Sequence, residues 1–247
     1  MGVLEAAARI VQLGGGSRES ASVARMRATF EARTGAFAPE DAWFEERSRA
    51  FWCDAVTRGR FGREVEHDLS AEERLWLGPL ERAHRGLFQR VFQLPARRSS
   101  SDRRPRAAGD ESEVLVDVWS GAELVVTALE DASRAELEAA AGQLLDARVV
   151  GADEGAKGDP RRGGVVALLP GAVFHPPHAT PAIHEVLSAA HASGLKTHDT
   201  LDALLRMERT LRALSRVKAA YAYRPEALLA QPSGSQRPVR RGAKELK

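Results

Sequence analysis

The stretch from Val114 to Pro176 constrains the fold most, because its pattern is typical of β-strands and helical sequence lies on both sides of it. The segments VLVDVWS and AELVVTAL, which meet at Gly121, predict two strands joined by a tight turn. The segments LLDARVV and VVALLPGAVFH predict two more strands. Four short strands can bury a shared apolar face, whereas a lone hairpin is barely stable in water. We therefore expect a small antiparallel β-barrel or sheet of about four strands.

Helical patterns fill residues 20–95, which we expect to form one helical block. Ser70 and Glu73 have the spacing of a capping box, in which each side chain accepts a hydrogen bond from the other residue's backbone N–H. Helical spacing then continues past Gly78 and Pro79, where Pro79 should kink or split the helix. The apolar residues of this run are Leu75, Trp76, Leu80, Ala83, Leu87, Phe88, Val91 and Phe92.

Changes in composition divide the rest of the chain. Loops rich in Gly, Ser, Pro and charge have too little apolar surface to fold alone. The expected fold class is α+β, with a helical N-terminal block, the small β domain and a C-terminal helical pair that packs on the block. The expected divisions are a flexible arm at 1–19, the helical block at 20–95, a disordered basic linker at 96–110, the β domain at 111–177, the C-terminal helices at 178–230 and a disordered basic tail at 231–247.

Composition indicates a globular protein of the cytoplasm. The 247 residues are 43% hydrophobic and 28% charged, which is ordinary for a soluble domain with an adequate core. The one cysteine, Cys53, excludes an intramolecular disulfide, and we expect a buried, inert thiol. The sequence has no run of 18 apolar residues and no signal-peptide pattern, so we expect neither a membrane span nor secretion.

The net charge of +2 conceals two basic clusters. Residues 97–106 and residues 237–247 each carry a net charge of +4, which leaves the remainder mildly acidic. Four arginines at helical spacing near the C-terminus form one stripe, which could bind phosphates together with the clusters. The alternative is a solvated helix face in an arginine-rich proteome. The candidate nucleic-acid-binding residues are Arg206, Arg209, Arg212, Arg216, Arg103, Arg104, Arg240 and Arg241.

Five of the seven histidines lie between residues 175 and 198. Imidazoles can bind zinc, iron or nickel without any cysteine, so this group is a candidate metal site. The alternative is chance clustering of exposed histidines, with one of them, His175, at a strand end. The candidate ligands are His175, His178, His184 and His191.

Signatures of common enzymes are absent from the sequence, which has no GxGxxG, GxxxxGK[ST], GxSxG or HExxH. Asp117, Glu123 and Asp146 lie in or beside predicted strands and could pair as acid and base, but solvent-facing strand charges are commoner. We therefore expect no catalytic residue and no cofactor. Trp119, which precedes the predicted turn, is either a core residue or part of a contact patch.

The order of helical block, VxVDVWSGAELVVT, QLLDARVV, VVALLPGAVFHP and helical C-terminus resembles a family of uncharacterised proteins from GC-rich, myxobacterial-type bacteria. The resemblance covers residues 26–229 and implies only that the β segment and the helix at 201–223 belong to one unit. Because small barrels often serve as binding modules, we expect a non-enzymatic cytoplasmic binding or regulatory protein that acts through protein-protein contacts. The alternatives are a nucleic-acid-binding accessory factor and a metal-dependent enzyme that uses the His175–His198 cluster.

Overall fold

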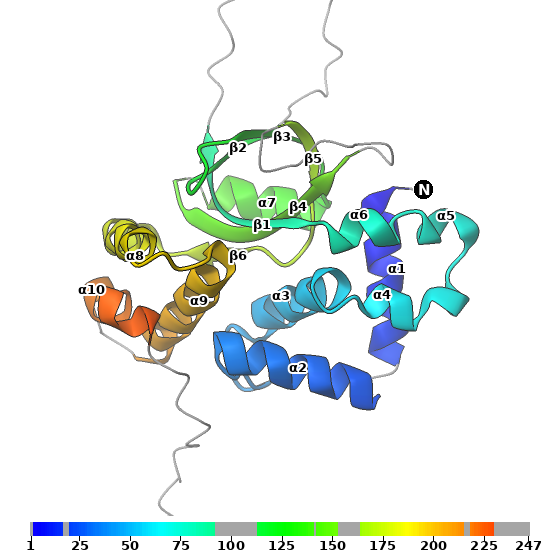
Figure 1. Ribbon diagram of the computed structural model, residues 1–247, viewed down its shortest axis with the longest axis horizontal. Coiled ribbons are helices and arrows are strands. Elements are labelled where there is room, and N and C mark those ends of the chain that lie inside the picture. The colour runs from blue at the N-terminus through cyan, green and yellow to red at the C-terminus, as the bar shows by residue number, and fades with distance from the viewer. Residues whose placement is uncertain are drawn as a thin grey trace, which may run out of the picture.

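The structure is a computed structural model that describes residues 2–16, 20–91, 113–140, 142–152, 164–214 and 218–229. The predicted linker at 96–110 and the predicted tail at 231–247 lie outside these ranges. Figure 1 shows a β-barrel with the N-terminal helices on one side and the C-terminal helices on another. The predicted α+β class is confirmed.

Five strands close into the barrel within the described ranges. In ring order they are β1 (His84–Val91), β2 (Glu113–Asp117), β3 (Glu123–Ala128), β5 (Gly164–Leu168) and β4 (Leu144–Gly151), which pairs with β1 again. A sixth strand, β6 (Val173–His175), pairs with β4 outside the ring. The pairs are antiparallel, as predicted, except that β3 and β5 run parallel. The predicted strand VVALLPGAVFH is divided at Pro170-Gly171 into β5 and β6.

Alternate strand residues fill the barrel interior, since successive side chains of a strand point to opposite faces. Phe88, Leu115 and Leu145 are among the fully buried side chains of this cluster. Leu137 of helix α7 (Asp131–Ala139) belongs to the same cluster, so α7 covers one mouth of the barrel (Figure 1). Each such side chain contributes about 1.5–3 kcal/mol on burial.

Strand β1 corrects the sequence prediction of a helix that continues to residue 92. The capping box at Ser70 is confirmed, but the helices after it, α5 (Ala71–Arg74) and α6 (Leu77–Glu81), are short. In β1, Phe88 points into the barrel and Leu87 packs against the C-terminal helices. Both faces of β1 are therefore buried, and its apolar residues do not alternate as they do in a half-exposed strand. The helical block ends before residue 84.

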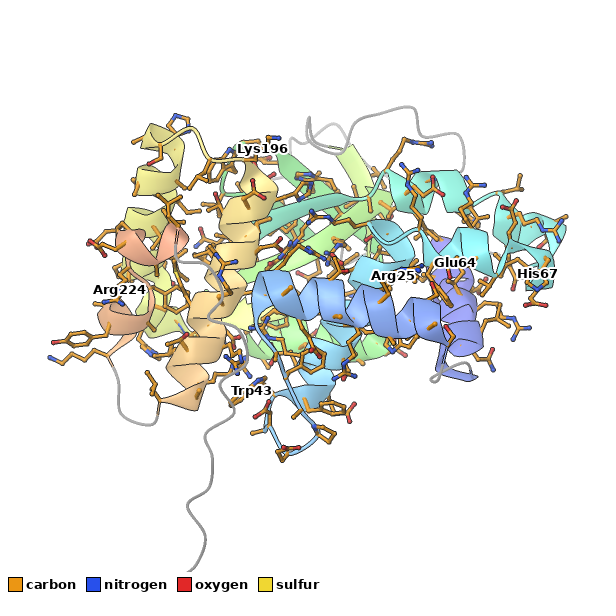
Figure 2. All side chains as sticks on the ribbon, turned by 60° about the horizontal axis from the view of Figure 1, so that its bottom comes forward. Arg25, Trp43, Glu64, His67, Lys196 and Arg224 are labelled. Atoms are coloured by element: carbon orange, nitrogen blue, oxygen red, sulfur yellow. The ribbon has the colours of Figure 1, made fainter. Side chains whose placement is uncertain are left out.

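Helix α1 (Val3–Gly16) corrects the expectation of a flexible arm at 1–19. Val3, Ala6, Ala7 and Ile10 recur at helical spacing and are buried in the core shared with the next helices. Those helices are α2 (Ala21–Thr34), α3 (Phe44–Thr57) and α4 (Phe61–Glu64), followed by the 3-10 turn η1 (Glu66–Asp68). Figure 2 shows Arg25 of α2 and Glu64 of α4 close together, and they form an ion pair at 3.8 Å.

The C-terminal helices pack on both the barrel and the N-terminal helices. They are α8 (Thr180–Ala192), α9 (Thr197–Ala213) and α10 (Ala219–Ala222), with the 3-10 turns η3 (Pro177–Ala179) and η4 (Pro225–Leu228). Figure 2 shows Lys196 at the start of α9 and Arg224 to one side of this helix, beside α10. Along α9, Leu204 belongs to the core with α8, and Leu205 belongs to the core of the N-terminal helices. No helix in the described part of the chain is long and apolar enough to cross a membrane.

Candidate functional site

A layer of buried charge lies between the barrel wall and the helices. Arg85 of β1 donates two hydrogen bonds to Asp146 of β4, at 2.9 and 2.6 Å, and one to Asp202 of α9, at 2.6 Å. Burial alone would raise the pKa of Asp202, but Arg85 and Arg33 outweigh it, so this pKa lies below its usual value. Asp146 is therefore part of an internal ion pair, not a solvent-facing strand charge.

The same layer continues through the N-terminal helices. Arg33 of α2 bridges Asp202, at 3.1 Å, and Asp54 of α3, at 2.5 Å. Asp54 also accepts a hydrogen bond from Arg148 of β4. These contacts join α2, α3 and α9 to the barrel wall through shared ion pairs.

The described arginines of the predicted stripe, Arg206, Arg209 and Arg212, are half-buried. Arg206 donates hydrogen bonds to the backbone oxygens of Arg33, at 2.6 Å, and Leu228, at 3.5 Å. Arg209 is half-buried, and its side-chain stem lies against Gly35. The alternative of a solvated helix face therefore does not hold for these two residues.

Arg212 belongs to a second group of buried charges. It pairs with Glu46 of α3, at 2.7 Å, and with Glu208, which also pairs with the buried Arg47. Burial raises the pKa of Glu46, against the opposing effect of Arg212. The remaining predicted nucleic-acid-binding residues, Arg216, Arg103, Arg104, Arg240 and Arg241, lie outside the described ranges.

The predicted metal ligands do not converge. His175 is fully buried, and its Nδ1 lies 2.8 Å from the hydroxyl of Tyr223, whereas His178, His184 and His191 are exposed. Among the residues that the structure describes, no three His, Cys, Asp or Glu side chains are grouped so that they could hold a metal ion. The His175–His198 cluster is therefore not a metal site.

Trp119 is half-buried between the barrel and α8. Its ring packs edge-on against the ring of His191, and the two ring centroids are 6.2 Å apart. Its backbone N–H donates to Asp117 Oδ1, and Asp117 Oδ2 lies 2.8 Å from His84 Nε2. Burial would raise the pKa of Asp117, but the bonds from His84 and the Trp119 backbone lower it overall. Trp119 thus packs as a cover on the apolar core of the C-terminal helices.

Two hollows lie side by side along α3, and they form the candidate site. The first, which we call the α7 hollow, has a volume of about 490 Å³. Its charged rim consists of two ion pairs, Glu46–Arg212 and Arg49–Glu136, the latter at 2.6 Å. Its apolar lining consists of Ala139, Ala140, Ala172, Phe174, Pro176 and Pro177.

The second hollow, which we call the α1 hollow, has a volume of about 350 Å³ and lies between α1 and α3. Gln12, Arg49 and Glu130 provide its polar groups. Arg49 lines both hollows, so they are neighbours. The apolar walls of the α1 hollow include Ala7, Ala8, Val11, Trp52, Cys53 and Val56.

Sequence reasoning missed this site. The residues of α3 that line the hollows are Glu46, Arg49, Trp52, Cys53 and Val56, at intervals that place them on one helix face. Phe51 of the same helix lies on another face and is buried in the core. The sequence feature that could have indicated the site is the face of α3 that lines the hollows, which has charged residues at one end and apolar residues at the other.

Comparison with known proteins assigns no activity to the chain: no family model matches it, and neither a curated protein nor a solved structure is significantly similar to it.

Proposed function

We propose that the protein is a non-enzymatic binding or regulatory protein of the cytoplasm that acts through protein-protein contacts, and that the α7 hollow is the contact surface. The observation that carries the proposal is an apolar lining that lies next to two ion pairs. Protein interfaces are commonly built in this way, with a water-excluded apolar centre and a polar rim. A side chain of the partner would enter the hollow, and the rim pairs would set its orientation.

The experiment compares two variants with the same substitution on α7. Ala139 is exposed and lines the hollow, whereas Ala135 is exposed on the same helix outside it. Ala139→Arg should remove the partner from crosslinked complexes in cells of the source organism, and Ala135→Arg should retain it. Complexes that are identical for the wild type and both variants would contradict the proposal. Cell fractionation tests the cytoplasmic location.

The nucleic-acid alternative rests on the basic clusters at 97–106 and 237–247, because Arg206 and Arg212 are engaged inside the protein. Binding of a generic duplex or single strand that weakens steeply with salt would favour it. Deletion of residues 237–247 should then reduce the salt dependence. This alternative would be favoured over the protein-contact proposal if the Ala139→Arg variant bound nucleic acid as the wild type does and also formed the same protein complexes.

A further inference from the structure

We propose that the α1 hollow binds an aliphatic carboxylate, with the apolar chain between α1 and α3 and the carboxylate on Arg49. This site is distinct from the α7 hollow and goes beyond the function proposed above. The volume of about 350 Å³ falls within the range of small-molecule sites, which are mostly apolar with few polar groups.

The walls of the α1 hollow suit an unbranched chain. Ala7, Ala8 and Val11 line it from α1, and Trp52 and Val56 line it from α3. None of these side chains has a charge or a strong acceptor, so a polar or branched ligand with several hydrogen-bonding groups would lose its hydration without replacement. An alkyl chain loses only unfavourable contact with water.

Arg49 supplies the charge complementarity. Among the described residues that line the α1 hollow it is the only cation, and its side chain is 42% exposed. Within the described part of the chain its guanidinium donates one hydrogen bond, from Nη1 to Glu136 Oε1. A guanidinium has five N–H donors in a planar fork, so donors remain for a carboxylate at the mouth of the hollow.

Glu136 and Glu130 allow an experiment that shows whether the α1 hollow binds anions or cations. Glu136 forms an ion pair with Arg49 and would repel a carboxylate bound there. Glu130 lines the α1 hollow and would also repel an anion. If the site takes anions, Glu136→Gln should strengthen binding and Arg49→Gln should weaken it. If the site takes cations, both changes should act in the opposite direction.

Cys53 provides a reporter within the hollow. It is the only cysteine of the chain, and it lines the α1 hollow. Burial raises the pKa of its thiol, so its reaction with a small uncharged thiol reagent should be slow enough to follow by mass spectrometry. A chain bound in the hollow should slow the reaction further.

The experiment measures the protection of Cys53 in the full chain by hexanoate, octanoate and decanoate, each below its micellar concentration. The apparent Kd should fall about fourfold for each added CH₂ until the hollow is full. Decanol should bind about tenfold more weakly than decanoate, and Arg49→Gln should abolish this difference. Absence of protection, equal protection by decanol and decanoate, or strongest protection by decylammonium would overturn the proposal.

Matched variants separate this proposal from the proposed function. Ala8 is exposed at the α1 hollow, and Ala24 is exposed on α2 outside it. Ala8→Phe should fill the hollow and abolish the dependence of protection on chain length, and Ala24→Phe should retain it. Ala8→Phe should also leave the complexes of the proposed function unchanged, since Ala8 does not line the α7 hollow. Binding that survives in Ala8→Phe would place the ligand elsewhere and refute the assignment.

Discussion

Asp202 holds the buried charge layer together, because it pairs with both Arg85 and Arg33. Asp202→Asn would leave these guanidinium groups undercompensated in the interior. We expect a loss of about 3–5 kcal/mol in the free energy of unfolding, measured by urea denaturation. Asp199→Asn, at an exposed position of the same helix, should cost less than about 1 kcal/mol. Equal effects of the two changes would show that the layer contributes little.

His175 makes stability sensitive to acid. Burial lowers its pKa to about 4, so the folded protein keeps it neutral. In the unfolded chain its pKa is about 6.5, so the unfolded state binds more protons below that pH. Stability is therefore fully present above pH ~6.5 and is lost as the pH falls toward about 4, by about 3 kcal/mol from this residue.

The measurement compares wild type with His175→Asn in urea at several pH values between 7 and 4. Asparagine can keep a hydrogen bond to Tyr223 but has no proton to gain in this range. The stability difference between wild type and variant should shrink or reverse as the pH falls. A constant difference would show that His175 is already protonated, or that it titrates equally in both states.

At the scale of elements, α1 is held by its buried face. Ile10 is fully buried among the side chains of the N-terminal helices. Ile10→Ala should destabilise the protein by about 2–5 kcal/mol, measured by urea denaturation. Gln12→Ala, at an exposed position of the same helix, should have little effect. A neutral Ile10→Ala would restore the sequence-based expectation of a flexible arm.

The turn between β5 and β6 sets the distance between the barrel and α3. Gly171 has φ of 99°, and a Cβ there would lie 2.5 Å from the backbone oxygen of Arg49. Gly171→Ala should therefore add a steric cost to the backbone strain. Gly121 also has positive φ, 73°, but a Cβ there would meet nothing within 4 Å. Gly121→Ala should cost about 1–2 kcal/mol, and Gly171→Ala should lower the melting temperature distinctly more.

At the scale of the whole molecule, the layers share one core. Val150 of β4, Val173 of β6 and Leu205 of α9 belong to the same apolar cluster as α1 and α3. We expect a single cooperative unfolding transition in urea. Three of the four tryptophans, Trp43, Trp52 and Trp76, lie in the N-terminal part, and the unfolding curve from tryptophan fluorescence should coincide with the curve from far-ultraviolet circular dichroism. Separate transitions would show that the barrel and the helices unfold independently.

The sequence alone was sufficient for helices and strands that are buried on one face or that carry a recognisable local motif. The capping box at Ser70 depends on residues three positions apart, and it is present. The strands from residue 113 onward were also predictable, because β-branched runs between turn residues identify them. These signals are local, so one chain segment is sufficient to detect them.

Only the tertiary structure decided the role of β1 and of the charged side chains. Burial of β1 on both faces removed the alternation that identifies a strand, and its apolar residues then matched helical spacing by coincidence. Arg85 and Asp202 are 117 positions apart, so no sequence window contains their ion pair. The face of α3 that lines both hollows likewise depends on α1 and α7, which reach it through the fold. The spacing of apolar residues in the sequence indicates which residues are buried, but the residues that pack against them are brought there by the tertiary structure.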